Sequence, residues 1–159
     1  MVRYLFIFGA LICLYMSPVP AGNIKIFDDN SLSTIIAQRE NWPFVLVIWS
    51  IDCAPCMKEL GLLSSMRTQY PQLDIVLVST DGQDSLNEVR SVLQSFAMGQ
   101  ADNWLFAVGN SQRLRYHIDE QWFGELPRTY FYTNATTRMA HSGALTRTQI
   151  DRWLQVIGG

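Results

Sequence analysis

Cysteine, histidine and charge are all scarce in this sequence. The 159 residues include three cysteines and two histidines, and only 16% are charged. The net charge of −2, without any run of basic residues, argues against nucleic acid as a main partner. Because 48% of the residues are hydrophobic and the length suits one domain, we expect a single globular domain rather than a disordered chain.

Only one long hydrophobic segment occurs, and it lies at the N-terminus. Arg3 precedes the apolar segment Tyr4–Met16, and small residues before and at Ala21 fit a cleavage site. The segment is shorter than the roughly 20 residues that cross a membrane. It predicts a signal peptide over residues 1–21 and an exported domain over residues 22–159, soluble after cleavage in the periplasm or an equivalent compartment. The alternative is an uncleaved membrane anchor.

Removal of that segment changes the cysteine count. Cys13 lies within it, so the mature chain keeps only Cys53 and Cys56. A bridge between them closes a very small loop and constrains little of the unfolded chain, so a purely stabilising role explains it poorly. The alternative of a zinc site needs two more ligands, and His117 and His141 lack ligand spacing. The pair therefore predicts redox chemistry without a metal.

The hydrophobic pattern predicts strands that alternate with helices. A continuous apolar segment, 44–49, is typical of a central strand covered on both faces, and the cysteines open a helix that runs to about Gln69. Further strands are expected at 23–27, 73–80, 104–108, 129–132 and 137–141, and further helices at 31–40, at 85–98 with Gly99 as the stop, at 111–117 and after Thr146. This order predicts an α/β fold whose mostly parallel sheet ends in an antiparallel hairpin, with 137–141 at the edge.

The two cysteines are expected to differ in reactivity. Cys53 begins the helix, where free backbone N–H groups favour its thiolate, so it is the predicted nucleophile. Cys56 lies one turn further in and suits the resolving role, in which it attacks the mixed disulfide and releases the substrate. Pro55 fits the first turn of the helix, where its missing N–H costs nothing.

Four motifs together resemble one family. They are the strand that ends in Trp49, the sequence Cys53-Ala54-Pro55-Cys56, Glu59, and Leu126-Pro127 before the strand 129–132. The chain resembles the thioredoxin-like thiol–disulfide oxidoreductases, and among them the exported TlpA/ResA-type branch. The resemblance implies a thioredoxin fold, with a central mixed β-sheet flanked by helices on both faces. It also implies a helix and strand insertion between Asp84 and Val108.

Glu59 is the candidate acid of this site. It follows Cys56 by three residues and therefore lies on the same helix face. From spacing alone, an exposed helix glutamate is an equal alternative. The resemblance implies that Glu59 takes the proton of Cys56 when the mixed disulfide is resolved. Val47 stands where ordinary thioredoxins carry a buried aspartate, which leaves Glu59 as the nearby acid.

The resemblance also implies a substrate-binding loop. Leu126-Pro127 matches the cis-proline loop of the fold, where the backbone of Leu126 would pair with a bound substrate strand. An ordinary trans-proline at the start of a strand is the alternative. Pro55 and Trp49 complete the predicted substrate-binding set.

We therefore expect an exported enzyme that reduces disulfides in partner proteins, for example in cytochrome c maturation. Asp52 beside Cys53 disfavours the thiolate and so favours reduction over oxidation. The redox disulfide replaces any cofactor, and a membrane thiol donor is expected to re-reduce a monomeric protein. The alternatives are a disulfide-forming oxidase and, from another class, a non-enzymatic copper-handling or binding protein.

Overall fold

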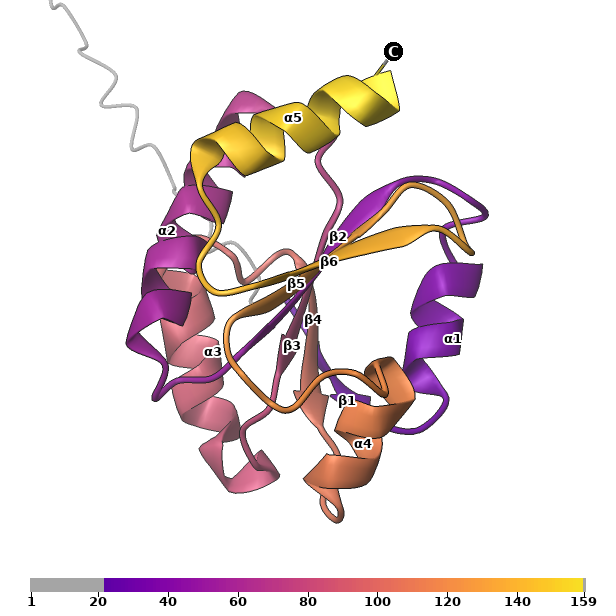
Figure 1. The fold of residues 1–159 in the computed structure, drawn as a ribbon. Helices are drawn as coiled ribbons and strands as arrows, with labels where there is room; N and C mark the ends of the chain where they lie inside the picture. The colour runs from indigo at the N-terminus through magenta and orange to yellow at the C-terminus, as the bar shows by residue number, and fades with distance from the viewer. Residues whose placement is uncertain (1–21, 159) are drawn as a thin grey trace, which may run out of the picture.

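The computed structural model describes residues 22–158, so the expected signal peptide lies outside the described residues. Its elements have the predicted order (Figure 1). They are β1 (Ile24–Phe27), α1 (Ser31–Ala37), β2 (Phe44–Trp49), α2 (Ala54–Gln69), β3 (Ile75–Ser79), the 3-10 turn η1 (Gln83–Ser85), α3 (Leu86–Ser95), β4 (Asp102–Phe106), α4 (Ser111–Ile118), β5 (Arg128–Tyr132), β6 (Arg138–Ser142) and α5 (Arg147–Gly158).

The six strands form one mixed sheet in the order β1-β4-β3-β2-β5-β6. The first four strands of that order are mutually parallel, and β5 and β6 add the antiparallel hairpin. β6 lies at an edge, as the sequence predicted. The helix and strand of the expected insertion are α3 and β4, and β4 lies inside the sheet between β1 and β3.

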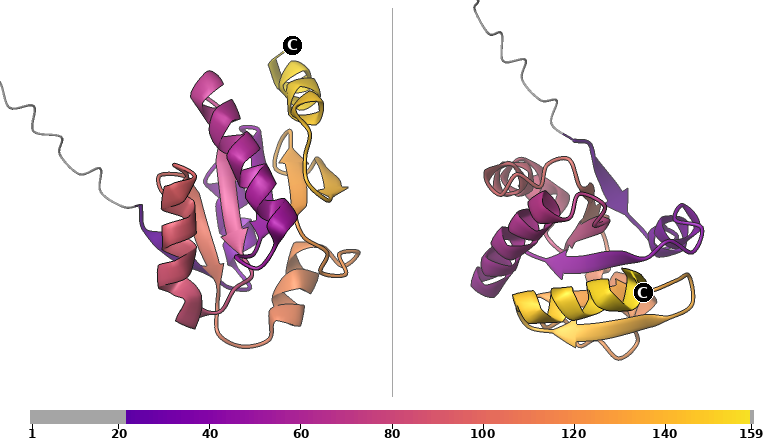
Figure 2. Two further views of the ribbon diagram at one scale, coloured as in Figure 1. Left: turned by 90° about the vertical axis from the view of Figure 1, so that its left-hand side faces the viewer. Right: turned by 90° about the horizontal axis from the view of Figure 1, so that it is seen from above.

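Helices cover both faces of the sheet (Figure 2). Every residue of β2 is buried, because its alternate side chains enter two different cores. Val45, Val47 and Trp49 pack with α2, α3 and α5, whereas Leu46 and Ile48 pack with α1 and α4. The prediction of a central strand covered on both faces is confirmed.

The first helix is shorter than predicted. It ends at Ala37 instead of Glu40, and Glu40 and Asn41 adopt positive φ angles of 45° and 75° as the chain reverses toward β2. The guanidinium of Arg39 pairs with Asp74 at 2.7 Å and with a second carboxylate at the start of β4. The Arg39 side chain thus ties the end of α1 to the residues at the starts of β3 and β4, and the chain leaves the helix before the last turn that the sequence predicted.

The inserted segment also departs from its predicted boundaries. α3 ends at Ser95, and Ala97 rather than Gly99 takes the left-handed backbone conformation, with φ 55°. β4 begins at Asp102, two residues earlier than expected. Its polar residue Asn103 is buried, and the side-chain amide donates to three carbonyl groups of the preceding loop. Those hydrogen bonds let a polar residue enter the sheet interior.

Parallel pairing of β2 and β3 sets the location of the cysteines. Trp49 pairs with Ser79, so the carboxyl ends of the two strands lie side by side. The turn 50–52 after β2 therefore meets the segment that follows β3. The cysteine helix α2 begins at this edge of the sheet.

Candidate active site

Cys53 and Cys56 form a disulfide at the N-terminus of α2. Cys53 is the N-cap residue in an extended conformation, and its Cα lies 5.2 Å from that of Cys56. The backbone N–H of Cys56 donates to the Cys53 sulfur at 3.2 Å. Pro55 occupies the first turn of the helix. This geometry places the Cys53 sulfur where the helix end stabilises a negative charge.

The two cysteines differ in exposure. Cys53 is half-buried, while Cys56 is only 1% exposed and packs in the core under α2. A substrate sulfur approaching from outside therefore meets Cys53 first. Such asymmetry fits an attacking thiol and a resolving thiol.

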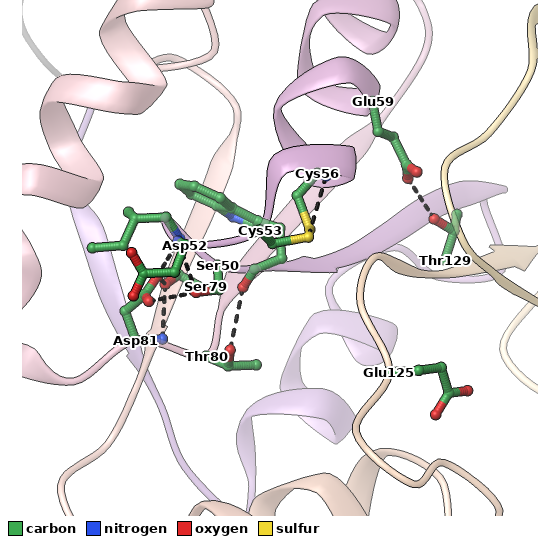
Figure 3. Close-up of a disulfide and its surroundings, with 12 residues drawn as sticks. Ser50, Asp52, Cys53, Cys56, Glu59, Ser79, Thr80, Asp81, Glu125 and Thr129 are labelled. Atoms are coloured by element: carbon green, nitrogen blue, oxygen red, sulfur yellow. Dashed lines mark hydrogen bonds between the residues drawn. A yellow bond between two sulfur atoms is a disulfide. The ribbon is translucent and has the colours of Figure 1, made fainter.

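Glu59 is buried one helical turn beyond Cys56. Its side chain is 1% exposed, so the alternative of a surface glutamate is excluded in this structure. Thr129 Oγ1 donates to Glu59 Oε1 at 2.7 Å, and the backbone N–H of Leu145 donates to Oε2 at 2.9 Å. Burial raises the pKa of Glu59, and the two hydrogen bonds oppose that rise only in part. Figure 3 shows the carboxylate directed at Thr129 of β5.

Val47 lies directly beside this carboxylate pocket. It pairs with Thr129 across the antiparallel β2–β5 ladder, and both side chains are buried. Side chains of such a pair stand about 5 Å apart on one face of the sheet. Glu59 thus reaches, from the helix, the space that an acid at position 47 would reach from the strand.

The loop before β5 contains the one cis peptide bond of residues 22–158, between Leu126 and Pro127. The cis geometry expected from the resemblance is therefore present. Pro127 is buried, and its carbonyl accepts from the Gly143 N–H at 2.9 Å. Leu126 is half-buried and packs against both cores. Its position two residues before β5 places the loop beside the cysteine turn, because Arg128 pairs with Ile48.

The remaining predicted substrate contacts lie in different environments. Pro55 is exposed at the helix start and is open to a partner. Trp49 is 1% exposed and packs in the core with Cys56, so it offers a substrate no surface in this structure. Its side chain instead forms part of the hydrophobic core that holds Cys56.

Asp81 is a site residue that the sequence reasoning missed. It follows β3 and accepts hydrogen bonds from Ser50 Oγ at 2.7 Å, from the Ile51 N–H at 3.0 Å and from Ser79 Oγ at 2.6 Å. It thereby fixes the turn that leads into Cys53 (Figure 3). The available signal was an aspartate directly after a strand that runs parallel to β2.

Asp52 lies in the turn held by Asp81. Its side chain is exposed, and its backbone N–H donates to Ser50 Oγ at 3.3 Å. Solvent screening weakens the effect of such a charge on Cys53. Within residues 22–158, no cluster of three His, Cys, Asp or Glu residues is arranged to hold a metal ion.

A six-stranded mixed sheet covered by helices, a CXXC disulfide at a helix start and a cis-proline loop define a thioredoxin-fold thiol–disulfide oxidoreductase. The particular family follows from the sequence: residues 41–121 match the model of the Thioredoxin-like family, and the chain belongs to that family. No curated protein sequence matches the chain.

Solved structures show the same fold at low sequence identity. A secreted Mycobacterium tuberculosis disulfide oxidoreductase homologous to E. coli DsbE has 18% identity and a TM-score of 0.53, with 76% of this chain and 85% of that one covered. A thioredoxin-related protein from Neisseria meningitidis serogroup B has 18% identity and a TM-score of 0.58 over 73% and 84%. A thioredoxin family thiol:disulfide interchange protein from Chlorobium tepidum has 12% identity and a TM-score of 0.59 over 77% and 84%.

Proposed function

We propose that this protein reduces disulfide bonds in partner proteins through the Cys53–Cys56 pair. In the reduced protein, the Cys53 thiolate attacks one sulfur of the substrate disulfide, and the other substrate sulfur leaves as a thiolate that takes up a proton. A mixed disulfide remains between Cys53 and the substrate. The single observation that carries this proposal is a disulfide at a helix N-terminus whose first cysteine is half-buried and whose second cysteine is only 1% exposed.

Cys56 completes the cycle. Its thiolate attacks the Cys53 sulfur of the mixed disulfide, which releases the second substrate thiol and forms the Cys53–Cys56 disulfide. Two electrons have then passed from the pair to the substrate. A dithiol donor must return the protein to the reduced state, and a membrane thiol protein is the proposed donor.

Glu59 is the proposed acceptor of the Cys56 proton. It is buried one turn from Cys56, and among the described residues no charged side chain forms an ion pair with it. Burial raises its pKa, which makes the carboxylate a better proton acceptor than an exposed glutamate. A water between the two groups would carry the proton.

A signal-peptide pattern, a secreted relative and Asp52 support an exported reductase. Residues 1–21 have the pattern of a signal peptide, and the solved relative from Mycobacterium tuberculosis is a secreted disulfide oxidoreductase. No helix of residues 22–158 is both long and apolar enough to cross a membrane. Asp52 favours the reducing direction. A role in cytochrome c maturation remains a proposal that identification of the partner would test.

The reduction potential of the Cys53–Cys56 couple tests the direction of electron flow. The purified protein would be equilibrated with glutathione buffers and its free thiols counted. A potential near that of thioredoxin, about −270 mV, is expected, whereas a value near −120 mV would indicate a disulfide-forming oxidase. Absence of exchange, with Cys53→Ser behaving like the unmodified protein, would contradict both activities.

A Cys56→Ser variant tests the assigned roles. It keeps the attacking thiol but cannot resolve the intermediate, so a mixed disulfide with a protein substrate should accumulate. Cys53→Ser is the matched control and should form none. Accumulation on Cys53→Ser instead would reverse the two roles.

A further inference from the structure

Phe123 is the most exposed large hydrophobic side chain of residues 22–158. It is 92% exposed, compared with 81% for Val108 and 75% for Trp42. A single exposed apolar residue is ordinary on a protein surface. Phe123 is unusual because of its place in the chain, three residues before the cis-proline loop residue Leu126.

The loop that carries Phe123 is anchored on its inner side by Trp122. That indole is 5% exposed, and its N–H donates to the Glu125 carbonyl at 2.9 Å. The backbone N–H of Trp122 also donates to the Asp119 carbonyl at 3.0 Å. With its neighbour packed inward, Phe123 is directed outward.

The following residues fix the loop further. Gly124 has a φ of 99°, a left-handed backbone conformation that favours glycine. The Glu125 carboxylate accepts from Ser142 Oγ at 2.7 Å and from Arg128 at 3.3 Å. The loop is therefore tied to the end of α4, to β5 and to β6, and it holds the Phe123 ring in solvent with no ring partner among residues 22–158.

Leu126 of this loop packs against the same core as Cys53. Glu125 lies in the surroundings of the disulfide, with its side chain directed away from the sulfur atoms (Figure 3). Three residues of extended chain span at most about 11 Å, so Phe123 lies within that distance of Leu126. The backbone N–H and carbonyl of Leu126 make no hydrogen bond with residues 22–158, which leaves them open to an extended segment.

We propose that Phe123 is a specificity-determining contact for the substrate of this site, and that the substrate is an extended peptide segment with an apolar side chain two or four residues from its disulfide cysteine. Side chains two or four residues apart lie on the same face of an extended segment, so such a residue can face Phe123 while the cysteine faces Cys53. An aromatic ring held by a fixed loop loses little conformational entropy when it binds. The inference rests on the proposed reductase function.

Peptides with a reporter disulfide test this proposal. Each peptide carries one cysteine bound to 5-thio-2-nitrobenzoate and either phenylalanine or aspartate two or four residues from that cysteine. The reduced protein forms its Cys53–Cys56 disulfide and releases the peptide thiol and the coloured thiol. We expect kcat/KM to be about tenfold higher for the phenylalanine peptide, because a buried aromatic contact has that order of effect.

The Phe123→Ala variant should abolish this preference. Each peptide rate is divided by the rate with the symmetrical nitrobenzoate disulfide, which reports the reactivity of the cysteine pair alone. Val156→Ala on α5 is the matched control, because Val156 is 63% exposed and distant in the chain from the site. It should retain the tenfold preference.

The outcomes separate this proposal from the reductase function. If Phe123→Ala keeps the preference, or lowers the rates with all disulfides equally, the specificity role is wrong while the reductase function stands. If the unmodified protein shows no preference, the role is likewise overturned. If it reacts with none of the disulfides, the reductase function itself fails.

Discussion

The Thr129 hydroxyl donates to the buried Glu59 carboxylate at 2.7 Å and thereby joins the cis-proline strand to the cysteine helix. The two residues are 70 positions apart in the sequence and nearly inaccessible to solvent. A hydroxyl can also accept a hydrogen bond, so Thr129 can remain a partner when Glu59 is protonated. The same contact therefore suits both states of a proton-transferring acid.

Thr129→Val should remove this hydrogen bond while keeping the shape of the side chain. We expect a loss of about 1–3 kcal/mol in the free energy of unfolding, because a buried acceptor loses its donor. The pKa of Glu59 should rise further, and the acidic limb of the pH profile for mixed-disulfide resolution should move to higher pH. Thr129→Ser should restore the profile. An unchanged profile for the valine variant would show that Thr129 is structural only.

Glu59→Gln should slow the resolution step by about 100-fold at neutral pH, because general acid–base catalysis typically contributes that much. Single-turnover measurement of substrate release after the mixed disulfide forms would report it. An unchanged rate would remove Glu59 from the mechanism without affecting the roles of the cysteines.

The same Glu59→Gln variant should differ in how stability depends on pH. The folded protein raises the pKa of Glu59 above its ordinary value of 4.5, so the protonated group stabilises the fold. That contribution is complete below pH 4.5 and is lost as the pH rises through the folded-state pKa. Denaturant unfolding from pH 4 to 8 should therefore show a smaller decline for the variant. Parallel curves would contradict a raised pKa.

Val47→Asp added to Glu59→Gln should restore about tenfold of the lost resolution rate. Val47 pairs with Thr129 across the sheet, so an aspartate there places an acid beside the same hydroxyl. Val47→Asn in the same background is the control, because it adds polarity without an ionisable group. Equal rates for the two double variants would show that the position of the acid does not matter.

Asp81→Ala should loosen the turn before Cys53. Three donors, among them the Ile51 N–H, would lose their acceptor. We expect a loss of about 2 kcal/mol in the free energy of unfolding and faster amide exchange at Ile51. Asp84→Ala is the control, since Asp84 is exposed and accepts no hydrogen bond from that turn. Unchanged exchange at Ile51 would show that other contacts hold the turn.

The sequence by itself determined the order of strands and helices, the mixed sheet and the position of the cysteine pair. These follow from hydrophobic periodicity and from short motifs, which act over a few residues. Boundaries were less predictable, as β4 shows. Its start at Asp102 depends on pairing with β1 and β3 and on a buried amide group, that of Asn103, whose NH2 donates to loop carbonyls.

Only the tertiary structure decided what surrounds the cysteines. Spacing placed Glu59 on the helix face of Cys56, but its burial depends on Thr129 and Leu145, which lie 70 and 86 residues further along the chain. Asp81 is part of the site because β3 runs parallel to β2. Trp49 cannot contact a substrate because three helices cover its face of the sheet. Local pattern assigns a residue to a face, whereas the residues packed opposite decide its environment and therefore its chemistry.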